Sequence, residues 1–511
     1  MRRPNRGALS AATKARLSEG ESRWRALRPW LLVRDEDAVL IAPPNHVFKL
    51  GGSALPLLRF LEAGGRLGDL PGSGGGPLDE ARAAELIRFF DELEAAAEGR
   101  APSGGFDRTA YDFDFSRLPI LGELALTYHC NERCRFCYAG CGPQGADVEA
   151  GAAASARAIP AGPTRLDAAG LGEAELSTAE WKSIITLLKT DAKVPFFSFT
   201  GGEPLLRPDL EELAAHGREL GLRINLITNG SLATPARAAS LRAAGIVSAQ
   251  VSLESPDEGI HDELVGIDGA WRRTTAGIGA LREAGISVQT NSTLTARNAE
   301  SLLRLPLFLR ELGVRRFSMN LFIPAGRGLG HEELFVPYSD CGEQIDAIRR
   351  EAHWAGLTFF WYSPTPYCLY NPVARGLGNK SCAALDGLLH VNPRGEILPC
   401  SSWPEPIGNL LATPFAELWF SERTRRFKHK TFAPAACEGC DSFMACQGAC
   451  PLYWRYTGEG ELENKAHRAG FAQPSAGAPS ISAATGSAPT AEAGVAPASS
   501  STSHREEYSN G

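Results

Sequence analysis

Three cysteines lie close together in the segment from Cys130 to Tyr138, directly after the short apolar run 124–128. Their C-x3-C-x2-C spacing can supply thiolates to three irons of a four-iron cluster, which leaves the fourth iron without a protein ligand. An open iron can bind a substrate or cofactor, whereas a cluster with four cysteine ligands usually only transfers electrons. The spacing of Cys130, Cys134 and Cys137 therefore predicts a cluster that takes part in a reaction.

Two other interpretations of this triplet stay open. A structural zinc site prefers four ligands and usually pairs two C-x2-C units. Cys141 follows Cys137 by four residues, and as a fourth thiolate it would close the iron. We expect instead that Cys141 is a free thiol.

Seven further cysteines are grouped toward the C-terminus. A zinc ribbon could use four of them, which leaves a structural zinc protein as an alternative. Clustered cysteines in a chain without a secretory signal are typical of metal ligation in a reducing compartment, so we expect a cytoplasmic protein. The seven are Cys368, Cys382, Cys400, Cys437, Cys440, Cys446 and Cys450.

The composition excludes several classes of protein. With 12 cysteines in 511 residues, the chain is too poor in cysteine for a disulfide scaffold, and its length predicts two or three domains. A net charge of −7 without a dominant basic block disfavours nucleic acid as the main partner. No run of about 18 apolar residues is present, so we expect no membrane span.

Short apolar runs alternate with amphipathic stretches from residue 118 onward. This alternation predicts an α/β fold with a parallel sheet, namely a partial (β/α)6 TIM-like barrel. Active sites of such barrels lie at the carboxyl ends of the strands, and Cys130 directly follows the first one. The expected strands are 123–128, 195–199, 223–228, 248–253, 287–291 and 316–321. The expected helices are 178–190, 208–220, 234–244, 271–284 and 299–312.

The rest of the chain divides around this barrel. An Arg/Ala-rich start is interpreted as a disordered lead-in, with an organellar transit peptide as the rival, and the Ala/Ser/Pro/Gly-rich end as a disordered tail. Three short strands and two helices predict a small N-terminal α+β, winged-helix-like domain. The expected ranges are a lead-in at 1–29, the small domain at 30–98, a linker at 99–117, the barrel at 118–335 with a flexible insertion at 142–176, a bridging segment at 336–365, a cysteine-rich C-terminal domain at 366–456 and a tail at 457–511.

The first cysteine segment resembles a known family. The pattern Thr127-x-x-Cys130-Asn-x-x-Cys134-x-Phe136-Cys137-Tyr138 is similar to the cluster loop of the radical S-adenosylmethionine (radical SAM) enzymes. The resemblance implies a 4Fe–4S cluster whose open iron chelates S-adenosyl-L-methionine, and whose reduction cleaves that cofactor to a 5′-deoxyadenosyl radical. It also implies a flavodoxin or ferredoxin-type reductant as partner. It covers residues 118–324 and continues beyond them.

Further motifs extend this resemblance to cofactor-binding positions. The segment 200–204, Thr-Gly-Gly-Glu-Pro, resembles the family's Gly-Gly-Glu-Pro motif, which binds the amino group of the cofactor. Glycines allow close backbone approach, and a carboxylate accepts hydrogen bonds from an ammonium. The segment 251–255 resembles the family's Ser-Leu-Asp-Gly, whereas 228–230 is interpreted as a turn. The implied cofactor-binding residues are Phe136, Gly201, Gly202, Glu203, Pro204, Ser252 and Asn291.

One departure concerns the segment after the fourth predicted strand. Related enzymes often carry an arginine where this chain has Val265, and an arginine there would clamp a carboxylate. Arg272, Arg297 or Arg327 could substitute, and the sequence leaves that choice open. It identifies no catalytic acid or base.

The C-terminal cysteines resemble the SPASM extension of peptide-modifying radical enzymes. The resemblance implies one auxiliary cluster on Cys382, Cys400 and Cys450, with Cys368 as a possible fourth ligand, and a second on Cys437, Cys440 and Cys446. Two closed clusters need eight thiolates, and the region has seven because no cysteine follows Cys450. One auxiliary cluster is therefore open, completed by another ligand such as Asp441, or absent.

Two more features bear on function. Sulfatase-maturing enzymes carry an Asp directly after an auxiliary-cluster cysteine, whereas Ser401 follows Cys400 here, so sulfatase maturation ranks low. The domain at 30–98 resembles the peptide chaperone of pyrroloquinoline quinone biosynthesis, which captures a leader peptide as an added strand; a structural cap is the plainer alternative. We expect a radical SAM enzyme that modifies a precursor peptide with a leader. The alternatives are tetrapyrrole or other small-molecule modification, and a structural zinc protein with a peptide-docking module.

Overall fold

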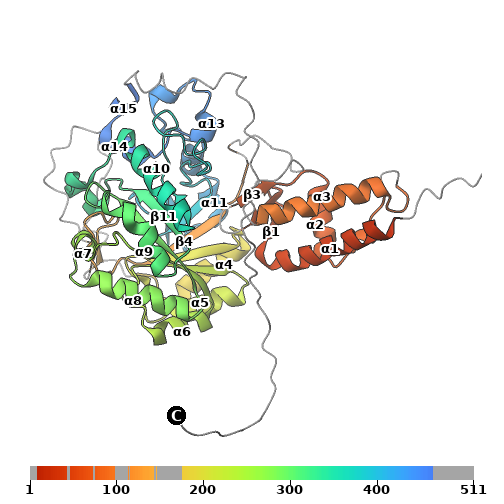
Figure 1. The fold of residues 1–511 in the computed structure, drawn as a ribbon, viewed down its shortest axis with the longest axis horizontal. Coiled ribbons are helices and arrows are strands. Elements are labelled where there is room, and N and C mark those ends of the chain that lie inside the picture. The colour runs from red at the N-terminus through yellow and green to blue at the C-terminus, as the bar shows by residue number, and fades with distance from the viewer. Residues whose placement is uncertain are drawn as a thin grey trace, which may run out of the picture.

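The computed structural model describes residues 9–42, 46–72, 75–97, 113, 115–142, 145–146 and 175–463. Residues 1–8, most of the predicted linker and insertion, and the predicted tail beyond residue 463 lie outside these ranges. A 10-stranded sheet forms the centre of the main body, and a smaller unit with its own 3-stranded sheet lies beside it (Figure 1).

The large sheet is mostly parallel. Its strand order is β12-β11-β10-β9-β8-β7-β4-β13-β14-β15, and every neighbouring pair from β12 to β13 is parallel. All carboxyl ends of these strands therefore lie at one edge. The strands are β4 (Leu121–Thr127), β7 (Phe196–Gly201), β8 (Arg223–Thr228), β9 (Ile246–Ser252), β10 (Ser287–Leu294), β11 (Arg316–Leu321), β12 (Thr358–Trp361) and β13 (Leu388–Val391), followed by the antiparallel β14 (Glu396–Leu398) and β15 (Gly408–Asn409).

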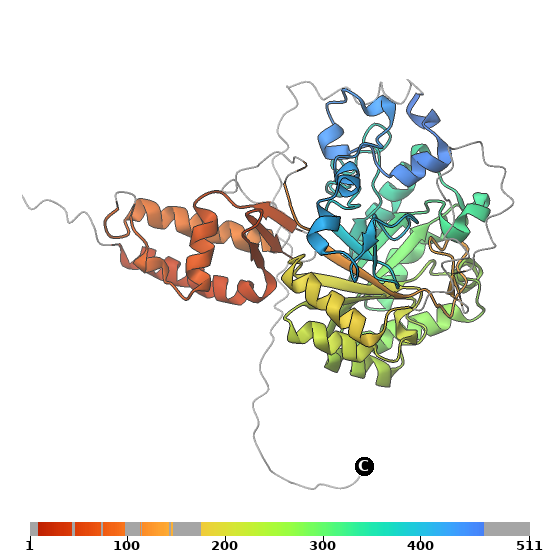
Figure 2. The same cartoon turned by 180° about the vertical axis from the view of Figure 1, so that it is seen from behind.

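Helices between the strands pack against the outside of the sheet (Figures 1 and 2). In the first of them, Ser177 and Glu180 form a capping box, and Trp181, Ile185 and Leu188 are buried against the sheet. The helices are α4 (Thr178–Thr190), α5 (Leu210–Glu219), α6 (Pro235–Ala244), α7 (Glu258–Val265), α8 (Ala270–Glu283), α9 (Leu305–Glu311) and α10 (Tyr338–Ala355).

The structure confirms an α/β fold with a parallel sheet and corrects its extent. The segment 336–365, predicted as a bridge, contains α10 and β12, and Phe317 of β11 pairs in register with Phe359 of β12. Leu388 of β13 pairs with Leu121 of β4, so the cysteine-rich region also contributes to this sheet. The parallel sheet thus has two strands beyond the six expected.

The N-terminal unit begins earlier than predicted. Residues 11–27 form helix α1 (Ala11–Leu27), which packs on α3 (Glu80–Ala97), so the prediction of a disordered lead-in at 1–29 is wrong over these residues. Leu17 and Trp24 are buried, and a Cβ at Gly20 would lie 3.3 Å from Phe90. The buried stripe of α1 is only one residue wide on each turn, as Leu17, Gly20 and Trp24, so the sequence pattern does not reveal it.

The rest of this unit follows the predicted order. Its sheet has the antiparallel order β1-β2-β3, and Leu40 and Leu58 lie in a core separate from that of the main body. The elements are β1 (Leu32–Arg34), β2 (Val39–Ala42), β3 (His46–Lys49) and α2 (Ala54–Glu62).

A buried ion pair joins the small unit to the main body. The Arg34 guanidinium pairs with Asp37 at 2.7 Å and donates to the carbonyl oxygens of Leu118 (3.1 Å) and Pro119 (2.6 Å). The Asp37 carboxylate also accepts from the N–H of Arg117 at 2.9 Å. Both charged side chains are almost fully buried, so each depends on the other and on these carbonyl and amide partners.

The C-terminal region is built of short helices with long loops. It extends past the predicted start of the tail at residue 457, because Glu461 accepts from the N–H of Ser339 at 2.9 Å and from the hydroxyl of Tyr453. Within the described ranges, no helix is long and apolar enough to cross a membrane. The helices are α11 (Phe415–Trp419), α12 (Glu422–Lys428), α13 (Phe443–Cys446), α14 (Pro451–Thr457) and α15 (Gly460–Glu463).

We predict that Arg34→Ala lowers the free energy of unfolding by about 3–5 kcal/mol, because it leaves the Asp37 carboxylate buried without its cation. Arg59→Ala is the matched control: this residue also pairs with a nearby acid, Asp35, but at 39% exposure, so its loss costs less than about 1 kcal/mol. Denaturant unfolding of the full chain measures both, and equal costs for the two variants would refute the role given to Arg34.

Candidate active site

The cysteine loop after β4 is held by backbone hydrogen bonds from several elements. The N–H of Cys130 donates to Gly142 (2.9 Å), and those of Arg133 and Arg135 donate to Val265 (3.0 Å) and Leu264 (2.9 Å) at the end of α7. The loop therefore has a defined shape, and all three thiols of the triplet come from one end of one strand.

Arg327 supports the same loop from the other side. Its guanidinium donates to the carbonyl oxygens of Cys134 (3.1 Å), Gly140 (3.0 Å) and Cys141 (3.0 Å). Its own N–H donates to the carbonyl oxygen of Cys137 at 3.0 Å. Arg327 is thus a positioning residue for the cysteine loop.

The candidate substitutes for the missing arginine at Val265 are engaged elsewhere. Arg272 pairs with Glu258 at 2.8 Å, Arg297 pairs with Glu263 at 2.6 Å, and Arg327 binds loop carbonyls. The side chain of Val265 itself is buried. The structure therefore does not identify a carboxylate clamp among these three arginines.

The thiols of the loop differ in acidity. A hydrogen bond from the Cys141 thiol lowers the pKa of Cys137 to about 6, and nearby N–H groups and Arg327 act in the same direction. Burial raises the pKa of Cys130 to about 12 and also raises that of Cys134. Iron binding would release protons from these thiols, because thiolates are the ligands.

Cys141 lies beside the triplet. It belongs to the short strand β5 (Cys141–Gly142), which pairs with β6 (Gly145–Ala146), and its N–H donates to the Cys137 sulfur at 3.3 Å. The structure thus brings a fourth sulfur next to the three predicted ligands. The prediction that Cys141 is a free thiol and does not bind iron stays a prediction.

Two glycines after β7 are required by the closeness of the cysteine loop. Gly201 has a φ of 127°, and a Cβ on it would lie 2.3 Å from the carbonyl oxygen of Thr127. A Cβ on Gly202 would lie 2.2 Å from the carbonyl oxygen of His129. Only glycine permits this contact, so the close approach that the structure shows is to the cysteine loop, and the approach to the cofactor stays a prediction.

Glu203 joins three elements at the sheet edge. Its carboxylate accepts from the N–H of Leu205 (2.9 Å), the hydroxyl of Thr228 (2.7 Å) and the N–H of Asn229 (2.8 Å). It is fully buried, and burial raises its pKa to about 7 against the effect of these bonds. Its Oε2 atom accepts one of these hydrogen bonds, from Asn229, so it has capacity to accept another from an ammonium.

Asn229 was interpreted from sequence only as part of a turn, yet it contacts the cysteine loop. Its side-chain amide approaches the Cys130 sulfur at 4.0 Å and donates to Asn131 Oδ1 at 3.0 Å. Asn131 in turn donates to the hydroxyl of Ser231 at 2.8 Å. The contact depends on how the end of β8 meets the loop after β4, which no local pattern reveals.

Ser252 and Asn291 are neighbours in the sheet. They pair in register, Ser252 at the end of β9 and Asn291 within β10, and the Asn291 side chain accepts from Ser318 at 2.8 Å. Phe136 instead packs against the buried residues Leu264 and Phe322. The structure thus brings Ser252 and Asn291 together beyond β7 and β8, and it gives Phe136 an apolar setting.

Three buried carboxylates make this edge of the sheet acidic. Burial raises the pKa of Glu132 to about 8, and the neighbouring Glu203 and Glu254 add to the shift. Burial also raises the pKa of Glu254 to about 8. Glu132 Oε1 has no hydrogen-bond partner within the described residues. A bound cation would stabilise these carboxylates in their charged form, so a ligand with an ammonium and a sulfonium group fits the site.

The seven C-terminal cysteines lie in loops and helix ends of the last region. Cys446 ends α13, Cys450 caps α14, and Cys400 follows β14. No described cysteine forms a disulfide. In the same ranges, no three Cys, His, Asp or Glu side chains are grouped tightly enough to hold one metal ion.

Two family profiles match this chain. The Radical SAM superfamily matches residues 124–305, and the SPASM iron–sulfur cluster-binding domain matches residues 382–441. These ranges contain the cysteine triplet with its glycine motif, and four of the seven C-terminal cysteines, namely Cys382, Cys400, Cys437 and Cys440.

Curated relatives fall into two groups. An AdoMet-dependent heme synthase of Methanosarcina barkeri is 29% identical over 359 residues, which are 67% of this chain and 95% of the relative. A PqqA peptide cyclase of Xanthomonas axonopodis pv. citri is 29% identical over 285 residues, 54% of this chain and 74% of the relative.

Among solved structures, SuiB of Streptococcus suis has a similar fold. Its TM-score is 0.56 at 15% identity, and the match covers 86% of this chain and 97% of SuiB. A second structure, of SuiB bound to the precursor peptide SuiA, has a TM-score of 0.55 at 15% identity. The overall arrangement of this chain therefore has a known counterpart.

We predict that Gly202→Ala weakens binding of S-adenosylmethionine at least tenfold and destabilises the fold by about 1–3 kcal/mol, because the new methyl group meets a backbone carbonyl that cannot move easily. Gly279→Ala in α8 is the matched control, since a Cβ there meets nothing within 4 Å. Equilibrium dialysis and thermal unfolding measure the two effects. Unchanged affinity in Gly202→Ala would contradict the close-approach role.

Stability of the iron-free protein should depend on Glu254 and pH. The folded-state pKa of Glu254 is about 8, against 4.5 for its ordinary value, so the folded state binds more protons than the unfolded state between these values. The contribution of protonated Glu254 to the free energy of unfolding is complete below pH 4.5 and is lost as the pH rises toward 8. The free energy of unfolding falls by at most about 1.4 kcal/mol per pH unit over this range.

Glu254→Gln removes this titrating group, so the stability of the wild type relative to the variant should fall as the pH rises from about 4.5 to about 8. Glu300→Gln removes an exposed carboxylate and is the control. Urea unfolding at a series of pH values measures the difference. A constant or rising difference for Glu254→Gln would show that this carboxylate is not kept protonated by burial.

Proposed function

We propose that this chain, which belongs to the radical SAM superfamily and carries a C-terminal SPASM domain, modifies a ribosomally made precursor peptide. The reaction begins with hydrogen abstraction from a side chain or backbone position of that peptide. The PqqA peptide cyclases among its relatives support a peptide as substrate. The product is a cross-linked, cyclised or oxidised peptide.

In this proposal the residues at the carboxyl edge of the sheet hold the reacting groups. Cys130, Cys134 and Cys137 ligate a 4Fe–4S cluster, which together with bound S-adenosylmethionine supplies a 5′-deoxyadenosyl radical when reduced. The Gly201–Pro204 segment receives the amino group of the cofactor. Ser252 and Asn291 contact its polar parts from the next strands, and Phe136 closes the apolar side.

The single observation that carries the peptide assignment is the small N-terminal unit docked beside the main body. Among the described strands, β3 pairs with β2 alone, so one of its edges has no strand partner. An extended peptide can add to such an edge through main-chain hydrogen bonds. Because the Arg34–Asp37 pair anchors this unit to the main body, a leader bound there would keep the rest of the peptide near the active site.

One further partner and the auxiliary clusters complete the proposal. Electrons come from a flavodoxin or ferredoxin-type protein. The SPASM region holds auxiliary 4Fe–4S clusters that accept or relay electrons during product formation. We propose a cytoplasmic location, where such clusters and free thiols persist.

A second candidate function is modification of a tetrapyrrole side chain. Its support is the heme synthase relative, which is matched over 95% of its length, together with the missing eighth cysteine. The small N-terminal unit with its open strand edge favours the peptide, because a tetrapyrrole needs no strand partner.

Co-expression tests the proposed function. We predict that a short open reading frame beside this gene encodes a peptide that loses two hydrogen atoms when co-expressed with the full chain, as a new cross-link requires. Mass spectrometry of the purified peptide measures the loss. A precursor without its leader should be modified at least tenfold less, because it lacks the strand that β3 would bind.

The control is co-expression with Cys134→Ala, which leaves the peptide unmodified. A tetrapyrrole with propionate side chains is offered in parallel to purified, reduced enzyme. Loss of carboxylate from the tetrapyrrole, with no change in any peptide, would overturn the peptide assignment in favour of the second candidate.

A further inference from the structure

Lys380 has an ammonium group without an anionic partner. The side chain is half-buried, and within the described ranges its ammonium makes no ion pair and donates no hydrogen bond. Its Nζ atom lies 5.7 Å from the centroid of the Tyr362 ring. A cation–π contact of this kind is weaker than a charge-assisted hydrogen bond to a carboxylate. Much of the cost of removing this cation from water is therefore uncompensated.

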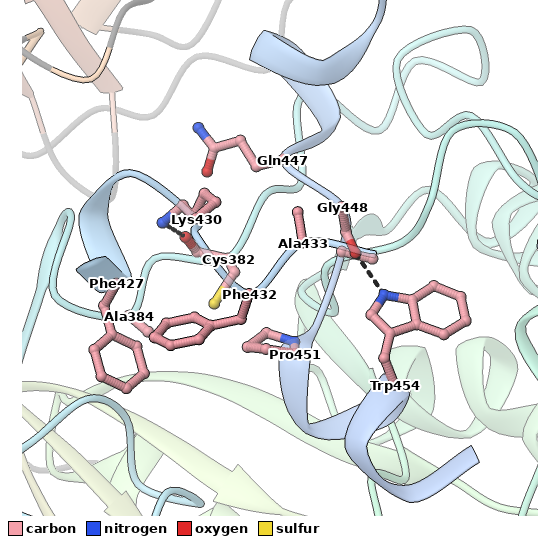
Figure 3. Close-up of a pocket in the computed structure, with 11 residues that line it drawn as sticks. Cys382, Ala384, Phe427, Lys430, Phe432, Ala433, Gln447, Gly448, Pro451 and Trp454 are labelled. Atoms are coloured by element: carbon pink, nitrogen blue, oxygen red, sulfur yellow. Dashed lines mark hydrogen bonds between the residues drawn. The ribbon is translucent and has the colours of Figure 1, made fainter. Parts of the chain in front are cut away.

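The other lysines show that such a group normally has an acceptor in this chain. Lys430 is the clearest contrast, because it lines a pocket of about 290 Å³ and its ammonium donates to the carbonyl oxygen of Cys382 at 2.6 Å (Figure 3). Apart from Lys380, every described lysine that is buried or half-buried donates to a carbonyl or carboxylate oxygen; these are Lys49, Lys182, Lys428 and Lys430. The missing acceptor is therefore specific to Lys380 among them.

The large sheet has an inner face, which points away from the helices. Ile224 of β8 faces helix α5, because it lies 3.1 Å from the position of a Cβ at Gly217. Side chains alternate along a strand, so Asn225 points to the inner face. The register from β8 through β9 to β10 places Gln289 on the same face as Asn225. Gln289 is half-buried, so this part of the inner face is open to a ligand.

Hydrogen bonds join Tyr362 to one of the predicted cofactor-binding residues. Gln289 Nε2 donates to the Tyr362 hydroxyl at 3.0 Å and to Ser318 Oγ at 3.3 Å. Ser318 in turn donates to the Asn291 side chain at 2.8 Å. The ring that lies beside the Lys380 ammonium is therefore on the inner face of the sheet. Three side chains in contact, those of Tyr362, Gln289 and Ser318, separate Lys380 from Asn291.

We propose that Lys380 binds a carboxylate of the substrate. This inference rests on the proposed function, in which the carboxylate is an aspartate or glutamate side chain of the precursor peptide. A carboxylate supplies the acceptor that the Lys380 ammonium lacks. Bound there, it would hold the peptide on the inner face of the sheet, near the predicted cofactor-binding residues. Tyr362 and Gln289 are positioning residues in this site, because they fix the ring beside which the ammonium lies.

Binding of paired peptides to paired variants tests this role. The probes are the precursor peptide encoded beside the gene and a matched amide peptide, in which every Asp and Glu outside the leader is changed to Asn or Gln. Isothermal titration calorimetry measures their affinity for the full reconstituted chain with S-adenosylmethionine. We predict that Lys380→Met weakens binding of the acidic peptide about tenfold or more, and that wild-type protein binds the amide peptide equally weakly. The two changes together should cost no more than either alone.

Three further variants serve as controls. Lys380→Arg keeps the charge and should retain most of the affinity, whereas Lys189→Met removes an exposed charge on α4 and should have no effect. Thermal unfolding separates a binding role from a structural one. Lys380→Met should leave the unfolding temperature unchanged or raise it, because it removes a half-buried charge that has no anionic partner. Lys430→Met should lower it, because the carbonyl oxygen of Cys382 loses its donor.

Equal affinity of wild-type protein and Lys380→Met for the acidic peptide overturns the proposal, and so does an equal loss for both peptides. Weaker binding of S-adenosylmethionine to Lys380→Met in equilibrium dialysis also overturns it, because the bound carboxylate would then be the cofactor's.

Failure of the proposed function is separate, since wild-type protein would then bind and modify no peptide. In that case a tetrapyrrole with propionate side chains and its methyl ester replace the two peptides. A preference for the acid over the ester that Lys380→Met abolishes would keep Lys380 as a carboxylate-binding residue while the peptide assignment falls. No such preference would overturn both.

Discussion

The candidate active site depends on a close contact between two backbones at the carboxyl edge of the parallel sheet. The N–H of Gly202 donates to Thr127 at 2.7 Å, and the N–H of Glu203 donates to His129 at 2.9 Å. These bonds join the end of β7 to the start of the cysteine loop. Any side chain at Gly202 would prevent them, so one glycine determines where the three thiols lie. Arg327 and the last turn of α7 then set the shape of the rest of the loop.

Burial of charge is the second organising feature. Glu132, Glu203 and Glu254 are all buried at this edge, where a carboxylate is costly unless a cation or hydrogen-bond donor stabilises it. Glu203 has three internal donors, whereas Glu132 has an oxygen without a partner among the described residues. A site for a cationic cofactor requires such buried carboxylate oxygens that lack a donor from the protein. The Arg34–Asp37 pair also follows from the cost of buried charge, because each of the two buried charges stabilises the other where the small unit joins the main body.

The sequence predicted the parts of the fold that depend on local patterns. The ranges of β8 and β11 match those expected, and in β8 the buried residues Ile224, Leu226 and Thr228 alternate with half-buried ones. Helix α1 was missed because only a narrow stripe of it is buried, and β12 because no motif marks the segment 336–365. At the site, the contact of Asn229 with Cys130 depends on tertiary register, which spacing along the chain does not encode. Cysteine counting shows that two closed auxiliary clusters would lack one thiolate.

The central claim is that the cysteine triplet leaves one iron open for S-adenosylmethionine. The most direct measurement is anaerobic incubation of reconstituted full-length protein with this cofactor and a strong reductant, followed by chromatography for 5′-deoxyadenosine. The account predicts that wild-type protein forms it and that Cys134→Ala does not, even where the auxiliary iron is retained. Wild-type protein that holds its cluster and binds the cofactor but forms no 5′-deoxyadenosine would contradict the account.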